Sequence, residues 1–291
     1  MSFSKNHREF REKNEIMKGT LYLVATPIGN LSDISERALK VLSEVDFVAA
    51  EDTRNTGLLL SRFGISKSMV SYFEHNKRER GELIVARIEE GESCALVTDA
   101  GTPAISDPGE DIVKLCAERG VNVVSVPGPC AAICALTLSA LSTGRFVFEG
   151  FISTNKSERR ERLKELASEQ RTLIIYEAPH KLRMTLDDLL KYFGDRRITL
   201  CRELTKLNEE AIRTTVASAV EFYKTNDPKG EYVLVIEGAP EKASVEYPED
   251  VTEHVNSLIE SGLDRMTAMK TAAKQRGISK SDVYKQYINE N

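Results

Sequence analysis

Residues 94–103 read Cys94-Ala95-Leu96-Val97-Thr98-Asp99-Ala100-Gly101-Thr102-Pro103, an apolar run that passes directly into a turn of small residues. A short apolar run closed by glycine and proline predicts a buried β-strand followed by a tight turn. The same pattern recurs at 19–27, which ends at Pro27, and at 121–129, which ends in Pro127-Gly128-Pro129. The sequence therefore predicts three buried strands with unusual loops at their carboxyl ends.

Helical stretches separate these strands along the first half of the chain. Further strands are predicted at 47–50 and 69–73, and helices at 32–45, 56–63, 77–89 and 110–119. Strands that alternate with helices indicate an α/β fold whose mostly parallel sheet is covered by helices on both faces.

The second half predicts another α/β layer, with a mixed sheet. Small residues at 130–141 favour a closely packed helix. Beyond it, strands are expected at 146–150, 172–176, 198–202 and 231–237, and helices at 157–168, 180–193 and 218–224. A chain of 291 residues suits more than one domain. We predict a polar N-terminal tail (1–18), an N-terminal α/β domain (19–128), a C-terminal α/β domain (129–238), and a linker with a helical C-terminal appendage (239–291). A ligand cleft is expected between the two α/β domains.

Composition limits the class of protein. No apolar run approaches the ~18 residues of a membrane span, and five cysteines without paired spacing predict reduced thiols in a cytoplasmic protein that binds no metal. The net charge of −5 argues against binding nucleic acid through bulk charge alone. Basic residues nevertheless gather at 156–164 and 265–285, which fits either local phosphate contacts or exposed helix faces of mixed charge.

Polar loops follow the predicted strands at the edge where ligands of open α/β sheets bind. Asp99 and Gly101 combine a carboxylate with a backbone that a ligand can approach closely, which suits a nucleotide-like ligand with a positive centre. Gly-x-Gly-x-x-Gly and Walker-type loops are absent from the sequence, which disfavours hydride and phosphoryl transfer. Three more polar loops are predicted to face the same cleft: Glu51–Arg54, Glu177–His180 and Arg202–Lys206.

The order of these motifs resembles the tetrapyrrole methylase superfamily, the class III S-adenosylmethionine-dependent methyltransferases. Within it, the chain is similar to the branch that methylates a cytidine 2′-hydroxyl in 16S ribosomal RNA of the small subunit. The resemblance runs from Gly19 to Gly238, extends into the helical tail, and rests on the strings LYLVATPIGNLSDIS (21–35), AAEDTRNTGLLL (49–60), ALVTDAGTPAISDPG (95–109), VPGPCAA (126–132), EGF (149–151), YEAPHKL (176–182), RELTK (202–206) and GEYVLVIEG (230–238).

The resemblance implies that S-adenosylmethionine lies between the two α/β domains and that the protein is a homodimer. The expected cofactor-binding residues are Asp99, Ala100, Gly101, Thr102, Pro103, Pro127, Gly128, Pro129 and Ala131. Contacts to ribosomal RNA are expected from Pro27, Gly29, Asn30, Glu51, Thr53, Arg54, His75, Asn76, Arg159 and Arg160. A ribose hydroxyl is a poor nucleophile, so a nearby base or cation should assist it. The candidates are Lys156, Glu177 and Asp52, with Asp99 as a fourth.

Two alternative functions remain open from the sequence. A methyltransferase of the same fold could act on a tetrapyrrole or a protein side chain, and a non-catalytic factor could bind small subunits during assembly. The loop at 25–30 departs from the Gly-x-Gly-Pro-Gly-Asp of the tetrapyrrole-modifying relatives, which disfavours a corrinoid or porphyrin substrate. The intact Asp99 and Gly101-Thr102-Pro103 disfavour loss of catalysis.

Overall fold

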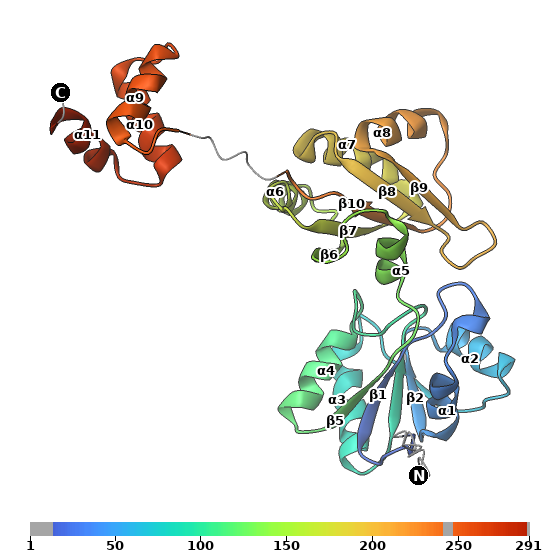
Figure 1. Cartoon of the computed structure of the whole chain (residues 1–291). Coiled ribbons are helices and arrows are strands. Elements are labelled where there is room, and N and C mark those ends of the chain that lie inside the picture. The colour runs from blue at the N-terminus through green and yellow to red at the C-terminus, as the bar shows by residue number, and fades with distance from the viewer. Residues whose placement is uncertain (1–13, 241–246, 290–291) are drawn as a thin grey trace, which may run out of the picture. The chain divides into compact units, whose positions relative to one another are not determined.

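The computed structural model describes residues 14–240 and 247–289 of the chain (Figure 1). The chain divides into two compact units, one ending at Ala239 and the other beginning at Pro240, and each is described by itself. Residues 1–13 of the expected tail and 241–246 of the expected linker lie outside the described residues. The domain boundaries expected from the sequence, including the one after Gly128, stay predictions.

The first sheet of the larger unit has five strands, all parallel, in the order β3-β2-β4-β1-β5. At its centre, Leu21 pairs with Cys94. The strands are β1 (Thr20–Val24), β2 (Phe47–Ala50), β3 (Ser68–Ser71), β4 (Cys94–Val97) and β5 (Asn122–Val126). The parallel sheet predicted from the alternating pattern is therefore confirmed.

Helices cover both faces of this sheet, because alternate strand residues point to opposite sides. Tyr22 packs with α1 (Glu36–Glu44) and α2 (Thr53–Arg62), whereas Leu21 packs with α3 (Lys77–Glu89) and α4 (Gly109–Glu118). The chain thus leaves β1 toward one face and leaves the neighbouring β4 toward the other. Adjacent strands whose connections diverge in this way form the topological switch point, where α/β sheets bind ligands.

The second sheet is mixed, as the sequence predicts, in the order β6-β7-β10-β8-β9. Its β6 (Phe146–Phe151) and β7 (Thr172–Glu177) are parallel, and β10 (Tyr232–Ile236) runs antiparallel to both of its neighbours, β7 and β8 (Arg197–Arg202). The edge strand β9 (Glu210–Thr215), antiparallel to β8, is missing from the sequence prediction.

One face of the second sheet packs on α6 (Lys156–Leu166), α7 (Leu182–Phe193) and α8 (Val216–Thr225). The other face packs on α5 (Ala131–Leu138), which ends before the predicted residue 141. Ile28, from the loop after β1, joins this second core cluster. The loop after β1 therefore packs against the core that lies between α5 and the second sheet.

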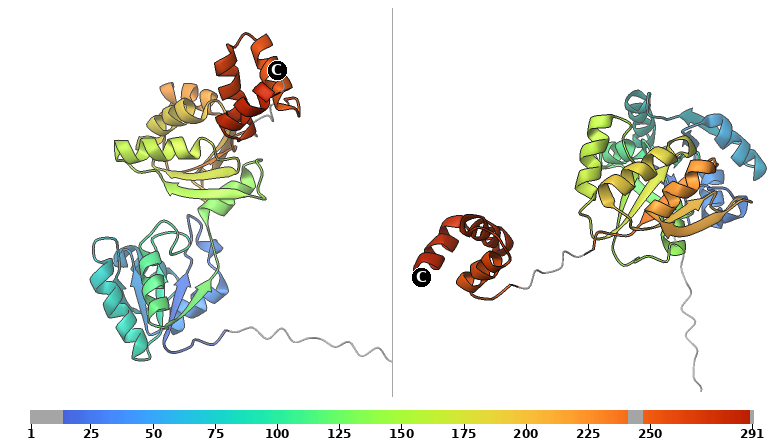
Figure 2. Two further views of the ribbon diagram at one scale, coloured as in Figure 1. Left: turned by 90° about the vertical axis from the view of Figure 1, so that its left-hand side faces the viewer. Right: turned by 90° about the horizontal axis from the view of Figure 1, so that it is seen from above.

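The smaller unit is a group of three helices with its own core (Figure 2). Its helices are α9 (Val251–Glu260), α10 (Arg265–Arg276) and α11 (Lys280–Asn289). Val255, Ala272 and Val283 are fully buried between them, and the carboxylates of Asp250 and Asp264 cap the first two helices. Within residues 14–240 and 247–289, no helix is long and apolar enough to span a bilayer.

Candidate active site

The loops after β1 and β4 are joined at the switch point by two backbone hydrogen bonds. The Thr26 N–H donates to the Gly101 carbonyl at 2.9 Å, and the Gly101 N–H donates back to Thr26 at 3.1 Å. Gly101 adopts φ +86°, and a Cβ there would lie 3.3 Å from Cγ2 of Ile28. Glycine is required at this position because other residues avoid that conformation. The bridge holds the 99–103 loop against the first loop.

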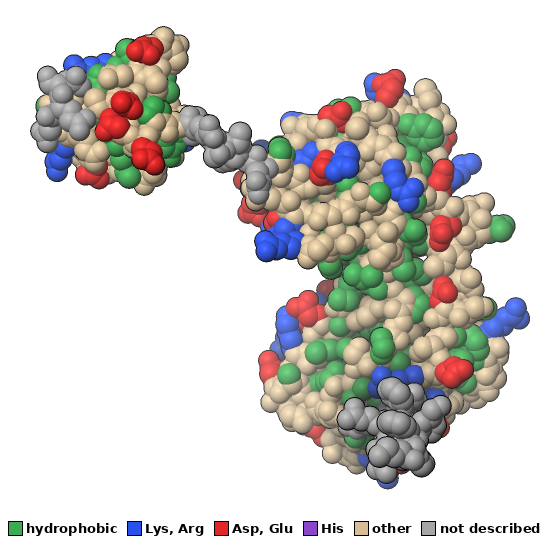
Figure 3. Space-filling model, viewed as in Figure 1, with side chains coloured by type: hydrophobic (Ala, Val, Ile, Leu, Met, Phe, Trp, Pro, Cys, Tyr) green, Lys and Arg blue, Asp and Glu red, His purple; other side chains and the backbone are tan. Residues whose placement is uncertain are grey.

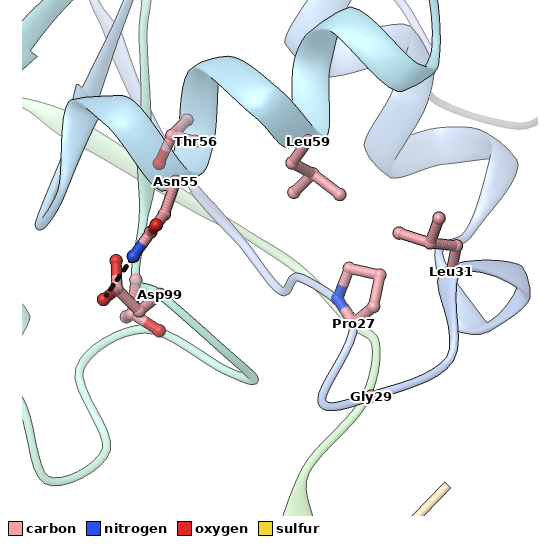
Figure 4. Close-up of a pocket in the computed structure, with 8 residues that line it drawn as sticks. Pro27, Gly29, Leu31, Asn55, Thr56, Leu59 and Asp99 are labelled. Atoms are coloured by element: carbon pink, nitrogen blue, oxygen red, sulfur yellow. Dashed lines mark hydrogen bonds between the residues drawn. The ribbon is translucent and has the colours of Figure 1, made fainter. Parts of the chain in front are cut away.

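A cavity of about 150 Å³ opens beside this bridge (Figure 4). Its wall comes from the loop after β1, the first turns of α2 and the end of β4, and consists of Pro27, Gly29, Leu31, Asn55, Thr56, Leu59, Thr98 and Asp99. On one side of the cavity, the Asn55 side-chain amide donates to Asp99 Oδ2 at 3.2 Å. Three segments that are distant in sequence therefore meet where the topology predicts a ligand.

The edge beside the cavity carries negative charge. The Asp99 N–H donates to Glu51 Oε2 at 3.5 Å, so the two acidic side chains are neighbours. Partial desolvation, followed by the charges of Asp99, Asp107 and Asp52, raises the pKa of Glu51 above its usual value, and the Asp99 N–H opposes this shift. Asp52 is paired with Arg54, so the negative charge that suits a ligand with a positive centre comes from Glu51, Asp99 and Asp107.

The third loop, Pro127–Pro129, contacts the 99–103 loop. The Thr102 hydroxyl donates to the Pro129 carbonyl at 2.9 Å. Gly128 lies against Ala25, whose Cβ would be 2.9 Å from a Cβ at position 128. Beyond this loop, the Ala132 N–H donates to the Tyr176 hydroxyl of β7 at 3.1 Å. The two segments expected to bind the cofactor are thus brought together, and one of them is tied to the second sheet.

The first-sheet loops also touch the second sheet at two close approaches. A Cβ on Gly150 of β6 would lie 2.7 Å from the Ser106 hydroxyl, and one on Gly29 would lie 2.8 Å from the Thr205 hydroxyl. Asp107 holds the first of these loops by accepting three backbone N–H groups, those of Ala104, Ile105 and Gly109.

The three expected catalytic residues lie in different environments. Lys156 is exposed at the first residue of α6. Glu177 is 4% exposed and accepts hydrogen bonds from the Ala178 N–H, at 2.8 Å, and from the Thr185 hydroxyl. Asp52 caps α2, and hydrogen bonds from Arg54 lower its pKa to about 2. A carboxylate with so low a pKa is a weak proton acceptor at neutral pH, so Asp52 suits the role of base least well.

The buried position of Arg159 argues against the RNA contact predicted for it together with Arg160. Its guanidinium donates to Asp188 Oδ2 at 2.6 Å and to the Thr185 hydroxyl at 2.9 Å, and its side chain is only 7% exposed. It shares a buried face of α6 with Leu163 and therefore stabilises the second sheet's core instead of reaching a phosphate. The Arg160 side chain is 56% exposed beside Glu161, and the RNA contact expected there stays a prediction.

Only two of the other expected substrate residues line the cavity. Pro27 and Gly29 line it, and Glu51, Thr53 and Arg54 follow β2 at the same sheet edge. The Asn30 side chain caps the short 3-10 helix η1 (Leu31–Asp33). Asn76 accepts from the Phe73 N–H at 2.8 Å, so it and the exposed His75 belong to the turn after the outer strand β3 and do not line the cavity.

Sequence reasoning missed the α2 wall of the cavity. Asn55, Thr56 and Leu59 lie on its first turns, whereas the helix was expected only from residue 56. Asp52 is a good N-cap residue, and this signal places the helix start correctly. Across the described parts of the chain, no group of three or more His, Cys, Asp or Glu residues could hold a metal ion.

Comparison with known proteins relates this arrangement to methyltransferases. A family model described as Tetrapyrrole (Corrin/Porphyrin) Methylases matches residues 20–220. The chain is 46% identical to the Ribosomal RNA small subunit methyltransferase I of Synechocystis sp., over 91% of this chain and 96% of the relative. It is 44% identical to the protein of the same name from Halalkalibacterium halodurans, over 98% of this chain and 100% of the relative.

A solved structure has the same fold. Uroporphyrin-III C-methyl transferase from Thermus thermophilus, crystallised with S-adenyl homocysteine, superposes with a TM-score of 0.55 over 74% of this chain and 96% of its own. The sequences are 18% identical, so this likeness concerns the fold alone.

Proposed function

The chain belongs to the tetrapyrrole (corrin/porphyrin) methylase family, and on that premise we propose that it methylates ribosomal RNA of the small subunit with S-adenosylmethionine. The observation that carries the proposal is the 44% identity over 98% of the chain to a relative of that name. The finer proposal, that the acceptor is the 2′-hydroxyl of a cytidine in 16S RNA, is supported by the motif resemblance along 19–238.

The loops at the switch point fit such a methyl donor. When bound, S-adenosylmethionine would supply a methyl group on a positively charged sulfur: the acceptor oxygen would bond to the methyl carbon in line as the carbon–sulfur bond breaks and the neutral thioether leaves. Asp99 and Glu51 present negative charge at the cavity, and Gly101 lets the backbone approach a ligand closely. We propose that residues 99–103, with Pro127, Gly128, Pro129 and Ala131, bind the donor. Their contribution to rate is mainly alignment of donor and acceptor.

Lys156 is the proposed residue that assists the acceptor hydroxyl. It is exposed, whereas Glu177 is buried and hydrogen-bonded within the second sheet's side of the unit. An ammonium group near the acceptor oxygen would stabilise the negative charge that develops there as the hydroxyl passes its proton to solvent water. The exposed Arg160 is the proposed contact to the RNA backbone beside it.

The raised pKa of Glu51 predicts how donor affinity depends on pH. As pH falls from neutral toward about 5, Glu51 should gain a proton earlier than an ordinary glutamate. The edge then loses a negative charge, and binding of the sulfonium weakens. We expect Glu51→Gln to bind the donor about 3- to 10-fold more weakly at neutral pH, with a flatter pH profile. Isothermal titration calorimetry across this range measures the effect.

A matched control is Glu118→Gln, which neutralises an exposed glutamate at the end of α4. It should keep the wild-type profile. If Glu51→Gln also retains the full pH dependence, Glu51 does not face the donor.

The direct test of the proposed function is transfer of labelled methyl from S-adenosylmethionine to small subunits that lack the modification. Nuclease digestion and mass spectrometry then identify the nucleoside. We expect 2′-O-methylcytidine. Label in another nucleoside would disprove the finer proposal, and label in a corrinoid, porphyrin or protein, with none in RNA, would favour the alternative substrates. Subunit binding without consumption of the donor would indicate an assembly factor.

The expected homodimer and cytoplasmic location stay predictions. The dimer rests on the family resemblance, and light scattering coupled to size-exclusion chromatography measures it. A ribosomal substrate would place the activity in the cytoplasm.

A further inference from the structure

Strand β6 contains a β-bulge at its carboxyl end. In its parallel pairing with β7, Phe148 lies opposite Ile174, Gly150 opposite Ile175 and Phe151 opposite Tyr176, so Glu149 is an extra residue. Gly150 adopts φ +69°, a conformation that glycine accepts readily. Bulges bend a strand and re-aim its side chains, and they are frequent beside active sites.

The bulge brings two aromatic rings onto one face of the sheet. In a regular strand, Phe148 and Phe151 would point to opposite faces because they are three residues apart. Here both rings pack edge-on against Tyr176, with centroids 5.0 and 5.5 Å away. This face is the one that packs on α5 and on Ile28 of the first loop. The three rings therefore lie on the side of the second sheet that contacts the cofactor-binding segments.

Contacts on both sides fix the bulge. The Glu149 carboxylate, 12% exposed, accepts two hydrogen bonds of 2.6 Å from Arg162 on α6. On the other side, Gly150 lies so close to Ser106 that a Cβ would be 2.7 Å from its hydroxyl. Ser106 belongs to the loop that follows the expected donor-binding residues 99–103. Phe151 is thus held in a defined position relative to that loop.

Phe151 remains 60% exposed although its neighbours are partly buried. The hydroxyl of Tyr176, against which it packs, accepts from the Ala132 N–H, next to the Pro127–Ala131 segment. In the space-filling view, hydrophobic side chains gather at the waist of the larger unit, between its two sheets (Figure 3). The bulge in β6 turns an exposed aromatic ring toward the site. Such a ring suits a flat, apolar ligand.

We propose that Phe151 is the platform on which the base of the target nucleotide stacks. The inference rests on the proposed function and concerns how the target nucleotide is bound. Proteins that recognise single-stranded or extruded nucleotides stack the base on an aromatic side chain, and this contact tolerates any base. Lys156, the residue proposed to assist the acceptor hydroxyl, is also exposed and follows Phe151 by five residues. Phe151 is a substrate-binding residue in this scheme, with no part in proton transfer.

The test compares Phe151→Ala and Phe151→Tyr with the wild-type protein. Methyl transfer to unmodified small subunits gives kcat and KM, and equilibrium dialysis with labelled S-adenosylmethionine gives the donor Kd. Loss of one base–aromatic contact should lower kcat/KM for Phe151→Ala roughly 10- to 100-fold. The tyrosine variant keeps the ring and should remain close to wild type. The donor Kd should stay unchanged in both.

Phe222→Ala is the matched control. Phe222 on α8 is also half exposed and packs edge-on against a tyrosine, Tyr223, at 5.0 Å. It should leave both parameters unchanged. Wild-type kcat/KM in Phe151→Ala overturns the inference, and so does an equal loss of donor affinity, which would place the ring against the donor. A wild-type protein that leaves the RNA unmethylated overturns the proposed function instead.

Discussion

Replacing Arg159 by alanine should lower the free energy of unfolding by about 3–5 kcal/mol, although the residue lies in a run of charges. Its guanidinium is the cation of a buried group that includes Asp188, Thr185 and Glu177. Removing it leaves Asp188, 27% exposed, without its ion-pair partner, and takes away the donor to Thr185, whose hydroxyl bonds the 4% exposed Glu177. Unpaired carboxylates in such a setting are expensive because water cannot solvate them fully.

The neighbouring arginine gives the control. Arg160→Ala removes a 56% exposed side chain whose partner, Glu161, is equally exposed, so the change in unfolding free energy should stay within about 0.5 kcal/mol. Urea unfolding followed by circular dichroism measures both variants. Equal stability of the two would show that Arg159 does not support the second sheet's core.

Asp99→Asn should reduce kcat/KM for methyl transfer by about 100-fold, the largest effect that we expect at the cavity. The substitution keeps the size of the side chain and a group that can still pair with Asn55, but it removes the charge. A charge-assisted hydrogen bond to a bound cationic ligand is worth roughly 1.5–3 kcal/mol, and its loss acts on donor binding and on the transition state together. The methyl-transfer assay with the donor below saturation measures the loss.

Asp187→Asn, at an exposed position on α7, is the matched control and should retain wild-type activity. Unchanged activity in Asp99→Asn would remove this carboxylate from the donor site. A lower unfolding midpoint accompanying the loss would instead assign it a structural role.

The family and the α/β fold were predictable from the sequence because their signals are local. The helix expected at 77–89 coincides with α3, and the strand expected at 94–98 matches β4 except for its last residue. The strand β9 was missed because Glu210–Thr215 is a half-polar edge strand with no apolar run, and its pairing with β8 defines it. Edge strands are polar on their exposed side, so composition does not distinguish them from loops.

Two features of the site depend on distant contacts and could not be read from one segment. The buried face of Arg159 follows from the partners Thr185 and Asp188, which α7 supplies from elsewhere in the chain. The bulge in β6 follows from its register with β7, since Phe146–Phe151 alone also fits a regular strand. The expected cofactor loops could be assigned to one edge because all strands of a parallel sheet have their carboxyl ends on the same side.

The strand order of the second sheet has a consequence for how the chain is made. Its central strand, β10, follows every other strand of the described residues along the chain, and it joins β7 to β8. Before Tyr232 emerges from the ribosome, β6–β7 and β8–β9 can form only two separate ribbons, each with an unpaired inner edge. Such edges invite wrong pairing between nascent chains. The second sheet can therefore close only after β10 has been synthesised, and until then both ribbons are exposed to wrong pairing.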